Sequence, residues 1–228
     1  MRKDFPEVLY EDNHIIIVNK RSSDLVQGDS TGDESLDEKV KAYIREKYGK
    51  PGDVFLGVVH RLDRPVSGCV VYARTSKALS RLSELFRSRE VKKQYWAVVS
   101  DRPPAEEGVL RNYLKKNEKQ NKSYVYETEV KGSKQAELSY LLLSRSERFY
   151  LLEIDLHTGR HHQIRAQLAA AGCPVKGDLK YGSKRSNEGG GISLHARRVS
   201  FIHPVKKTEV IVVAPLPDDR TWRLFRNV

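Results

Sequence analysis

The sequence predicts an α+β fold with a mainly antiparallel mixed sheet that is flanked by helices and loops. Strand-like segments outnumber helical ones, and many of them follow one another without an intervening helix. With 228 residues, 39% of them hydrophobic, the chain is able to form a sizeable core. It contains no internal repeat, low-complexity tract or linker longer than a turn. We therefore expect a single domain over residues 1–228.

Periodicity and turn residues place the elements of the first part of the chain. Ser35 and Glu38 have the spacing of a capping box, and Gly49 stands where a helix stop belongs. A second helix carries Leu79 and Leu82 on one face. In chain order the pattern predicts a β-hairpin over residues 8–18, a polar loop over 22–32 and a helix over 35–49. Two short strands over 54–59 and 69–73 and a helix over 76–90 follow.

The rest of the chain is predicted to be mostly strand, with one short helix. That helix is expected to end at Gly172 and Pro174, two residues that cannot readily continue it. We expect a strand over residues 94–100, a turn over 102–108 and a run of strands over 109–156 with a polar tip at 115–122. The helix is expected over 163–171 and two last strands over 193–201 and 209–213.

The charge of the chain favours a polyanionic partner. Its formal net charge is +11 at pH 7, and a surplus of this kind attracts nucleic acids. The alternative is a basic surface that only keeps the protein soluble. Charge alone does not decide between the two.

The termini and cysteines bear on the compartment. Residues 1–3 are not followed by an apolar run of signal-peptide length, and no stretch approaches the roughly 18 apolar residues of a spanning helix. Only two cysteines occur, Cys69 and Cys173. We expect a cytoplasmic protein without a membrane partner and without a disulfide between these cysteines.

The first candidate site is the segment His-Arg-Leu-Asp-Arg-Pro-Val-Ser-Gly at residues 60–68, between two apolar strands. Functional loops on a rigid scaffold occupy such positions. Asp63 is flanked by Arg61 and Arg64, which favour the ionised carboxylate, and an ionised carboxylate acts as a nucleophile or a base. The alternative is an ordinary turn, since Asp, Pro, Ser and Gly are turn formers.

Two further segments carry residues suited to RNA chemistry. After the Thr158-Gly159 turn, a helix is expected to begin with His162, Gln163 and Arg165 in its first turns, and exposed helix N-termini bind anions. The alternative there is a solvated basic helix start. In the strand that follows residue 92, Tyr95 is able to stack on a base and offer its hydroxyl, unless it is simply a core residue.

Neither a metal nor a nucleotide cofactor is predicted. His157, His161 and His162 cluster in sequence, and His60 and Asp63 could join them, but the first two straddle a glycine turn and no His-Glu-x-x-His or Cys pair occurs. Glycine-rich phosphate-binding motifs are missing as well. We expect no cofactor.

Taken together, these segments resemble the RluA-type pseudouridine synthase family. The family signature His-Arg-Leu-Asp-x-x-Thr-Ser-Gly is present except that Val66 replaces threonine. The resemblance covers about residues 8–217. It includes the motifs Lys-x-Tyr at residues 93–95, Thr-Gly-Arg-x-His-Gln-Ile-Arg at 158–165, Gly-Asp-x-x-Tyr-Gly at 177–182, Leu-His-Ala at 194–196 and Phe-Ile-His-Pro at 201–204.

The chain departs from the family pattern at two further places. Residues 20–26, Lys-Arg-Ser-Ser-Asp-Leu-Val, replace a Lys-Pro-x-Gly-Leu-type stretch. Many relatives carry a small RNA-binding domain ahead of the catalytic domain. Here we expect no separate N-terminal RNA-binding domain.

The resemblance implies a reaction and roles for three residues. Uridine in ribosomal or transfer RNA is converted to pseudouridine without a cofactor, because uracil is both the leaving group and the nucleophile. Asp63 is the essential carboxylate, acting either on C1′ or on the 2′ proton. Arg165 pairs with Asp63 and keeps it charged and oriented. Tyr95 stacks on the uracil and helps to remove the C5 proton.

The resemblance also implies an RNA surface around these residues. The basic span 111–134 holds seven Lys or Arg residues against three glutamates, and it either extends this surface or is a solvated hairpin. The expected substrate or RNA contacts are His60, Arg61, Arg64, Arg160, His162 and Gln163.

Two other functions compete with this interpretation. A catalytically inactive RNA-binding module would bind RNA and leave every uridine unchanged. A metal-dependent nuclease that used Asp63 and the histidines would lose activity in chelator and shorten its RNA. The sequence leaves the oligomeric state open, with a monomer favoured.

Overall fold

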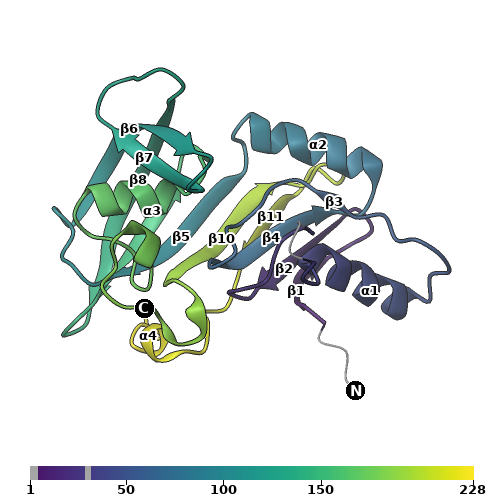
Figure 1. Ribbon diagram of the computed structural model, residues 1–228. Coiled ribbons are helices and arrows are strands. Elements are labelled where there is room, and N and C mark those ends of the chain that lie inside the picture. The colour runs from purple at the N-terminus through teal and green to yellow at the C-terminus, as the bar shows by residue number, and fades with distance from the viewer. Residues whose placement is uncertain (1–4, 29–31) are drawn as a thin grey trace. The chain divides into compact units, whose positions relative to one another are not determined.

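The computed structural model describes residues 5–28 and 32–228 (Figure 1). Residues 1–3, used above to judge targeting, and residues 29–31 of the predicted loop 22–32 lie outside the described residues. The chain divides into two compact units. The first unit comprises the chain up to Val91 together with Arg197–Pro215, and the second comprises Lys92–Ala196 together with Leu216–Val228.

The first unit is built on antiparallel strands, and its core helix is α2 (Ser76–Arg87). Ala78 and Leu82 of α2 pack against Ile15, Ile17 and Val71 of the strands. The helices α1 and α2 lie on opposite sides of these strands (Figure 1). The remaining elements are α1 (Leu36–Tyr48), β1 (Glu7–Glu11), β2 (Ile15–Lys20), β3 (Gly57–Val58), β4 (Ser67–Ala73), the end of β10 (Leu194–Ile202) and β11 (Glu209–Val213).

The second unit is an antiparallel sheet in the order β5-β9-β8-β6-β7. On one face, α3 (Gln163–Ala170) packs through Ala166 against Leu114 and Ala136. On the opposite face, the segment of α4 (Arg220–Arg223) places Trp222 on Trp96. The strands are β5 (Lys92–Val99), β6 (Glu107–Asn117), β7 (Lys122–Tyr126), β8 (Lys134–Arg145) and β9 (Tyr150–Leu156), and two short 3-10 turns follow α3 at Leu179–Tyr181 and Glu188–Gly190.

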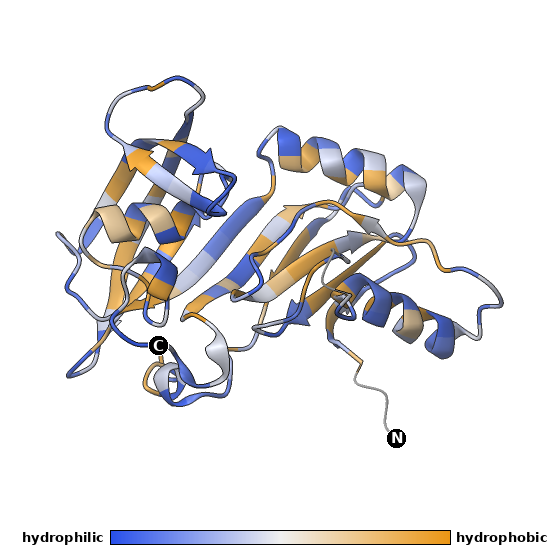
Figure 2. Ribbon diagram, in the orientation of Figure 1, coloured by the Kyte–Doolittle hydropathy of each residue, from blue (hydrophilic) through white to orange (hydrophobic). Residues whose placement is uncertain are grey.

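The predicted α+β class with mainly antiparallel strands is confirmed. In Figure 2 the helices α1 and α2 alternate hydrophobic and hydrophilic residues, as amphipathic helices that cover strands should. Gly49 ends α1 in the left-handed conformation, with φ of 56°. Ser35 is the N-cap as predicted, but its hydroxyl donates to Asp37 at 2.5 Å and makes no capping bond to a backbone N–H.

One predicted strand is much shorter than expected, and one helix was not predicted. The strand expected over residues 54–59 is only Gly57–Val58, which pairs with the last two residues of β4. A Cβ at Gly57 would lie 2.8 Å from Leu79 of α2, so the backbone of this strand passes directly beneath that helix. The short helix α4 was not predicted, because four residues are too few for a periodic pattern.

No helix among residues 5–28 and 32–228 is both long and apolar enough to cross a membrane. Cys69 and Cys173 are both buried free thiols.

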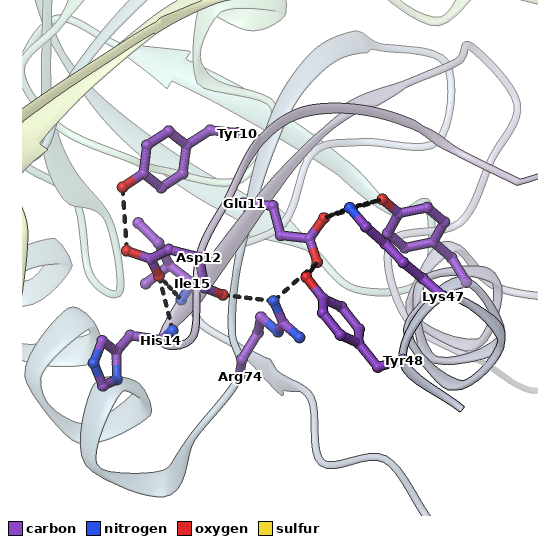
Figure 3. Close-up of polar contacts among 9 residues, drawn as sticks. Tyr10, Glu11, Asp12, His14, Ile15, Lys47, Tyr48 and Arg74 are labelled. Carbon is purple, nitrogen blue, oxygen red and sulfur yellow. Dashed lines mark hydrogen bonds and ion pairs between the residues drawn. The ribbon is translucent and has the colours of Figure 1, made fainter. Parts of the chain in front are cut away.

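A polar network around the buried carboxylate of Glu11 ties the β1–β2 hairpin to α1 and to the end of β4 (Figure 3). The side chain of Glu11 is 8% exposed and accepts hydrogen bonds from Lys47 at 2.7 Å, Tyr48 at 2.7 Å, Tyr43 at 3.0 Å and Arg74 at 2.9 Å. Burial raises the pKa of Glu11, but the hydrogen bonds from Lys47, Tyr48 and Tyr43 outweigh it, so that the pKa is lowered.

The next residue, Asp12, closes the hairpin. Its carboxylate accepts the backbone N–H groups of His14 at 2.8 Å and Ile15 at 3.0 Å. Lys206 and the buried ring of His203 lie 2.8 and 2.9 Å from its other oxygen. Asp12 therefore connects the first hairpin to the turn between β10 and β11.

Replacing Glu11 with alanine should lower the free energy of unfolding by about 2–3 kcal/mol, because Arg74 would stay buried without its carboxylate. The lowered pKa of Glu11 means that its stabilisation is present above the unfolded pKa of about 4.3 and is lost as pH falls through the folded pKa. The difference between wild type and Glu11→Ala in urea unfolding should therefore shrink from pH 7 towards pH 3.

Glu118→Ala is the matched control, since the side chain of Glu118 is 77% exposed, and it should change stability by less than about 0.5 kcal/mol. Equal unfolding curves for wild type and Glu11→Ala at pH 7 would contradict the structural role of Glu11.

Candidate functional site

Asp63 lies in the first unit on a turn between β3 and β4. The backbone N–H of Val66 donates to the carbonyl of Asp63 at 3.0 Å and closes this turn. Leu62 and Val66 are buried, with 8% and 3% of their surface exposed, whereas Asp63 itself is partly exposed. Two apolar side chains thus anchor the segment and leave the carboxylate at the surface.

Lys20 is the buried support of this turn. It is the last residue of β2, it pairs with Gly68, and none of its surface is exposed. Its ammonium donates to the carbonyls of Arg21 at 3.0 Å, Arg64 at 2.9 Å and Val66 at 2.6 Å. An ammonium has three N–H donors, so these three carbonyls saturate it.

The segment that follows Lys20 adds two more bonds to the same turn. The Ser22 hydroxyl donates to the carbonyl of Pro65 at 3.1 Å, and the backbone N–H of Ser23 donates to that of Arg64 at 3.0 Å. The carbonyls of residues 64, 65 and 66 are therefore all held from residues 20–23. This is the stretch at which the chain departs from the Lys-Pro-x-Gly-Leu pattern.

The charge of Lys20 interacts electrostatically with Asp24 and Asp63. Burial lowers the pKa of Lys20 to about 8, and the opposing charges of Asp24 and Asp63 act in the other direction. The ammonium is thus mostly protonated at neutral pH and attracts the Asp63 carboxylate. Sequence reasoning did not assign Lys20 a role, although a lysine that ends the otherwise apolar run from Ile15 to Val18 was a usable signal.

The other predicted residues of this segment divide into two kinds. The ring of His60 stacks on Phe86, with centroids 4.6 Å apart, and its Nε2 accepts the backbone N–H of Val71 at 2.9 Å. These contacts give His60 a positioning role. Arg61 is exposed, and half-exposed Arg64 pairs with Asp33 at 2.7 Å, so both guanidinium groups lie at the surface beside Asp63.

Arg165 lies in the second unit, on α3, and forms a buried ion pair. Its Nε donates to Asp178 at 2.6 Å and its Nη2 at 2.9 Å, while the two side chains are 5% and 1% exposed. The guanidinium also lies 5.1 Å from the ring centre of Tyr181. Asp178 and Tyr181 belong to the predicted Gly-Asp-x-x-Tyr-Gly motif, which sequence reasoning quoted without giving its residues a role.

The expected partner of Arg165 was Asp63. The pair with Asp178 uses two of the five N–H donors of the guanidinium, so it is compatible with a second carboxylate. The pairing with Asp63, which lies in the other unit, stays a prediction.

The prediction that the start of α3 is exposed and binds anions was wrong. His162, Gln163 and Arg165 are buried, with 9%, 3% and 4% of their surface exposed. Gln163 accepts from the Thr158 hydroxyl at 2.7 Å and from the backbone N–H of Arg160 at 3.0 Å, and it donates to the carbonyl of Glu137 at 3.0 Å. These bonds shape the turn that begins the helix and argue against direct RNA contact by Gln163.

His162 is similarly enclosed. It has φ of 54°, and its Nδ1 lies 3.0 Å from the Tyr181 hydroxyl. Burial lowers the pKa of His162 far below its ordinary value, and the nearby charge of Arg165 adds to the effect. A neutral, enclosed imidazole is a poor phosphate ligand. Arg160, by contrast, is partly exposed and donates from its Nε to the carbonyl of Gln135 at 2.8 Å.

Tyr95 lies on β5, where it pairs with Ile154 and is 8% exposed. Side chains alternate along the strand, so Tyr95 projects from the face opposite that of Trp96, on the side that α3 covers. Tyr95 and Arg165 thus share one face of the second unit.

Two histidines that cluster in the sequence, His157 and His161, lie within hydrogen-bond distance of polar side chains. The Nε2 of His157 lies 3.0 Å from the Ser139 hydroxyl, and the Nε2 of His161 lies 3.0 Å from the side-chain oxygen Oδ1 of Asn121. Within the part of the chain that the structure describes, no three His, Cys, Asp or Glu side chains gather as metal ligands.

Known proteins of one family are similar to this chain. The family described as RNA pseudouridylate synthase matches residues 14–170. A ribosomal large subunit pseudouridine synthase D from Xylella fastidiosa is 34% identical over 95% of this chain and 68% of its own length. An uncharacterized RNA pseudouridine synthase from Synechocystis is 31% identical over 92% of this chain. The chain spans only 65% of that relative's length.

A solved structure shares the fold. Human RNA pseudouridylate synthase domain containing 4 superposes with a TM-score of 0.80 over 96% of this chain and 92% of its own, at 23% identity.

Lys20→Met should loosen the Asp63 turn. Three carbonyls would lose their donor, so amide hydrogen exchange at Ser23 and Val66 should accelerate by about tenfold or more at pH 7. In the wild type, exchange corrected for its intrinsic pH dependence should rise above pH 8, where Lys20 loses its charge, and the variant should lack this rise. Lys41→Met on α1, where Lys41 is 35% exposed, should leave these amides unchanged. Wild-type exchange rates in Lys20→Met would refute the support role.

Asp178→Asn should destabilise the second unit by about 3 kcal/mol, because the buried guanidinium of Arg165 would lose the carboxylate that accepts from its Nε and Nη2. Urea unfolding measures the loss. Asp155→Asn, an exposed change on β9, serves as the control and should lie within about 0.5 kcal/mol of wild type. If the two variants unfold alike, the ion pair contributes nothing to stability.

Proposed function

Because the chain belongs to the RNA pseudouridylate synthase family, we propose that it converts specific uridines of structured RNA to pseudouridine, with Asp63 as the essential residue and without a cofactor. One observation carries the proposal. Asp63, within the matched region, is a partly exposed carboxylate on a turn that a buried lysine holds from below. Both units contribute to the matched residues, so we propose that they act as one catalytic domain.

The proposed reaction needs a carboxylate in a fixed position and consumes no second reactant. The C1′–N1 bond breaks, the uracil turns, and C5 bonds to C1′; C5 then releases a proton and N1 gains one. Nothing else enters or leaves, so the change is an isomerisation. Asp63 either attacks C1′ or removes the 2′ proton, while Lys20 holds the backbone of its turn and supplies a nearby positive charge.

Arg165 and Tyr95 complete the proposed chemistry. Asp178 fixes the orientation of the Arg165 guanidinium, so Arg165 is able to bind a second anion without having to reorient. We assign that anion to Asp63. Tyr95 is assigned to the uracil ring and to the departing C5 proton.

The proposed substrate is ribosomal or transfer RNA. Relatives named as ribosomal large subunit pseudouridine synthases support ribosomal RNA, and we propose a cytoplasmic location to match such a substrate. A uridine within a helix must leave its stack, which costs a few kcal/mol, and surface cations offset this cost. Arg61, Arg64 and Arg160 are the exposed or partly exposed arginines that we assign to phosphates.

The test is Asp63→Asn, which keeps the shape of the side chain and removes its charge. Pseudouridine formation, followed as tritium release from C5-labelled uridine RNA, should fall by at least about a thousandfold. RNA affinity should stay within about twofold, because phosphate contacts come from other residues. Activity of the wild type should persist in excess chelator.

Asp53→Asn, at a fully exposed position, is the control and should be fully active. If Asp63→Asn keeps more than about a tenth of wild-type turnover, a barrier change below about 1.4 kcal/mol, the catalytic assignment is wrong. If the wild type binds RNA and converts no uridine, the chain is an RNA-binding module instead.

A further inference from the structure

The outer face of the β6–β7 hairpin carries an unusual set of exposed aromatic rings. Tyr124 and Tyr126 lie on β7 with 39% and 38% of their surface exposed, and partly exposed Tyr113 lies on β6. Tyr113 is paired directly with Tyr126, and Lys115 with Tyr124, so all four side chains point to the same side of the sheet. We call these residues, with Lys122, the tyrosine face.

The tyrosine face lies opposite the packed face of the same strands. Leu114 and Val125, which alternate with the tyrosines, belong to the cluster that contacts α3. In Figure 1 the hairpin of β6 and β7 shows α3 on one of its sides. The strands therefore form a stable platform whose inner side is core and whose outer side is in solvent.

Positive charge accompanies the rings. Lys115 is exposed beside Tyr124, and the ammonium of Lys122 lies 5.6 Å from the centre of the Tyr124 ring. Arg111, on the same side of β6, is paired with Glu137 at 3.0 Å, which cancels the nearby carboxylate. The Tyr124 hydroxyl donates to Gln120 in the hairpin tip and fixes its ring.

Lys122 also connects the tyrosine face to the inner face. Its ammonium lies 5.1 Å from the centre of the Tyr181 ring, which in turn lies near Arg165 and His162. β7 is the last strand in the order β5-β9-β8-β6-β7, so this lysine sits at an edge around which a flexible chain is able to pass.

We propose that the tyrosine face binds a single-stranded stretch of the RNA substrate, by stacking bases on Tyr124 and Tyr126 while Lys115 and Lys122 neutralise phosphates. Aromatic rings interleaved with cations are what single-stranded nucleic acid requires, since every base offers a flat face and every nucleotide a charge. The two tyrosines are two residues apart on a strand, about 6.8 Å, so each ring offers a separate stacking surface. The inference rests on the proposed function, because it takes RNA as the substrate.

A double-stranded RNA would use this face poorly. Its bases are stacked on one another and are not available to the rings, whereas its phosphates would engage only the lysines. A protein partner would need an acidic surface to match the lysines. The combination of rings and lysines thus favours single-stranded RNA.

The experiment compares two double variants of the full chain. Tyr124→Leu with Tyr126→Leu keeps apolar bulk and removes the rings, whereas Tyr124→Phe with Tyr126→Phe keeps the rings and removes the hydroxyls. Binding to a fluorescein-labelled twelve-nucleotide oligouridine should weaken about tenfold or more in the leucine variant and less than about threefold in the phenylalanine variant. Affinity for an RNA duplex of the same length should stay unchanged in both.

Salt dependence separates stacking from charge. The slope of log affinity against log salt for the oligouridine should be the same in the leucine variant and in wild type. Lys115→Ala with Lys122→Ala should reduce that slope by about 1.4, since each phosphate contact to a single strand contributes about 0.7. Thermal unfolding checks that every variant is folded.

Four results would overturn the proposal. They are no binding of oligouridine by the wild type, wild-type affinity in the leucine variant, equal losses in the leucine and phenylalanine variants, or a leucine variant that changes only the self-association of the protein in sedimentation. The Asp63→Asn turnover assay is independent of these readouts, so failure of the catalytic proposal and failure of the tyrosine face are distinguishable.

Discussion

A charged ammonium held entirely inside the first unit is the constraint on which the Asp63 turn depends. Burial of an ion costs several kcal/mol unless its donors are all used, and Lys20 meets that condition only because three backbone carbonyls converge on it. The same bonds fix the turn, because moving the carbonyls of Arg64 or Val66 would leave the charge unsatisfied. The buried lysine thus requires three acceptors from the fold, and by binding them it fixes the turn that carries Asp63.

The second unit follows the same logic with a different cation. Arg165 is buried, and Asp178 holds two of its donors while Tyr181 faces its guanidinium plane. Buried pairs of this kind contribute little net stability compared with apolar packing, but they tolerate few alternative geometries. In each unit a buried cation therefore fixes a part of the chain that is proposed for the chemistry: Lys20 holds the Asp63 turn through backbone carbonyls, and Arg165 is itself held by Asp178. Arg61 and Arg160, which we assign to phosphates, remain at least partly in solvent.

This division between buried and exposed cations agrees with the two tasks that the proposed reaction sets. Bond rearrangement at C1′ needs groups whose positions are fixed before the substrate arrives. RNA binding needs mobile surface charges that neutralise phosphates along a flexible strand. The tyrosine face on β6 and β7 belongs to the second kind, since its rings and lysines are exposed on a rigid pair of strands.

The sequence by itself determined the fold class, both ends of α1 at Ser35 and Gly49, and the segments that carry Asp63, Tyr95 and Arg165, because these depend on local periodicity, capping and short motifs. It did not reveal that Lys20 is buried beneath residue 64, that Arg165 is paired with Asp178, or that the start of α3 is enclosed. Those features join residues 13 to 44 positions apart in the chain. Only the tertiary structure decided them, since burial and partner choice arise when distant strands and turns pack together.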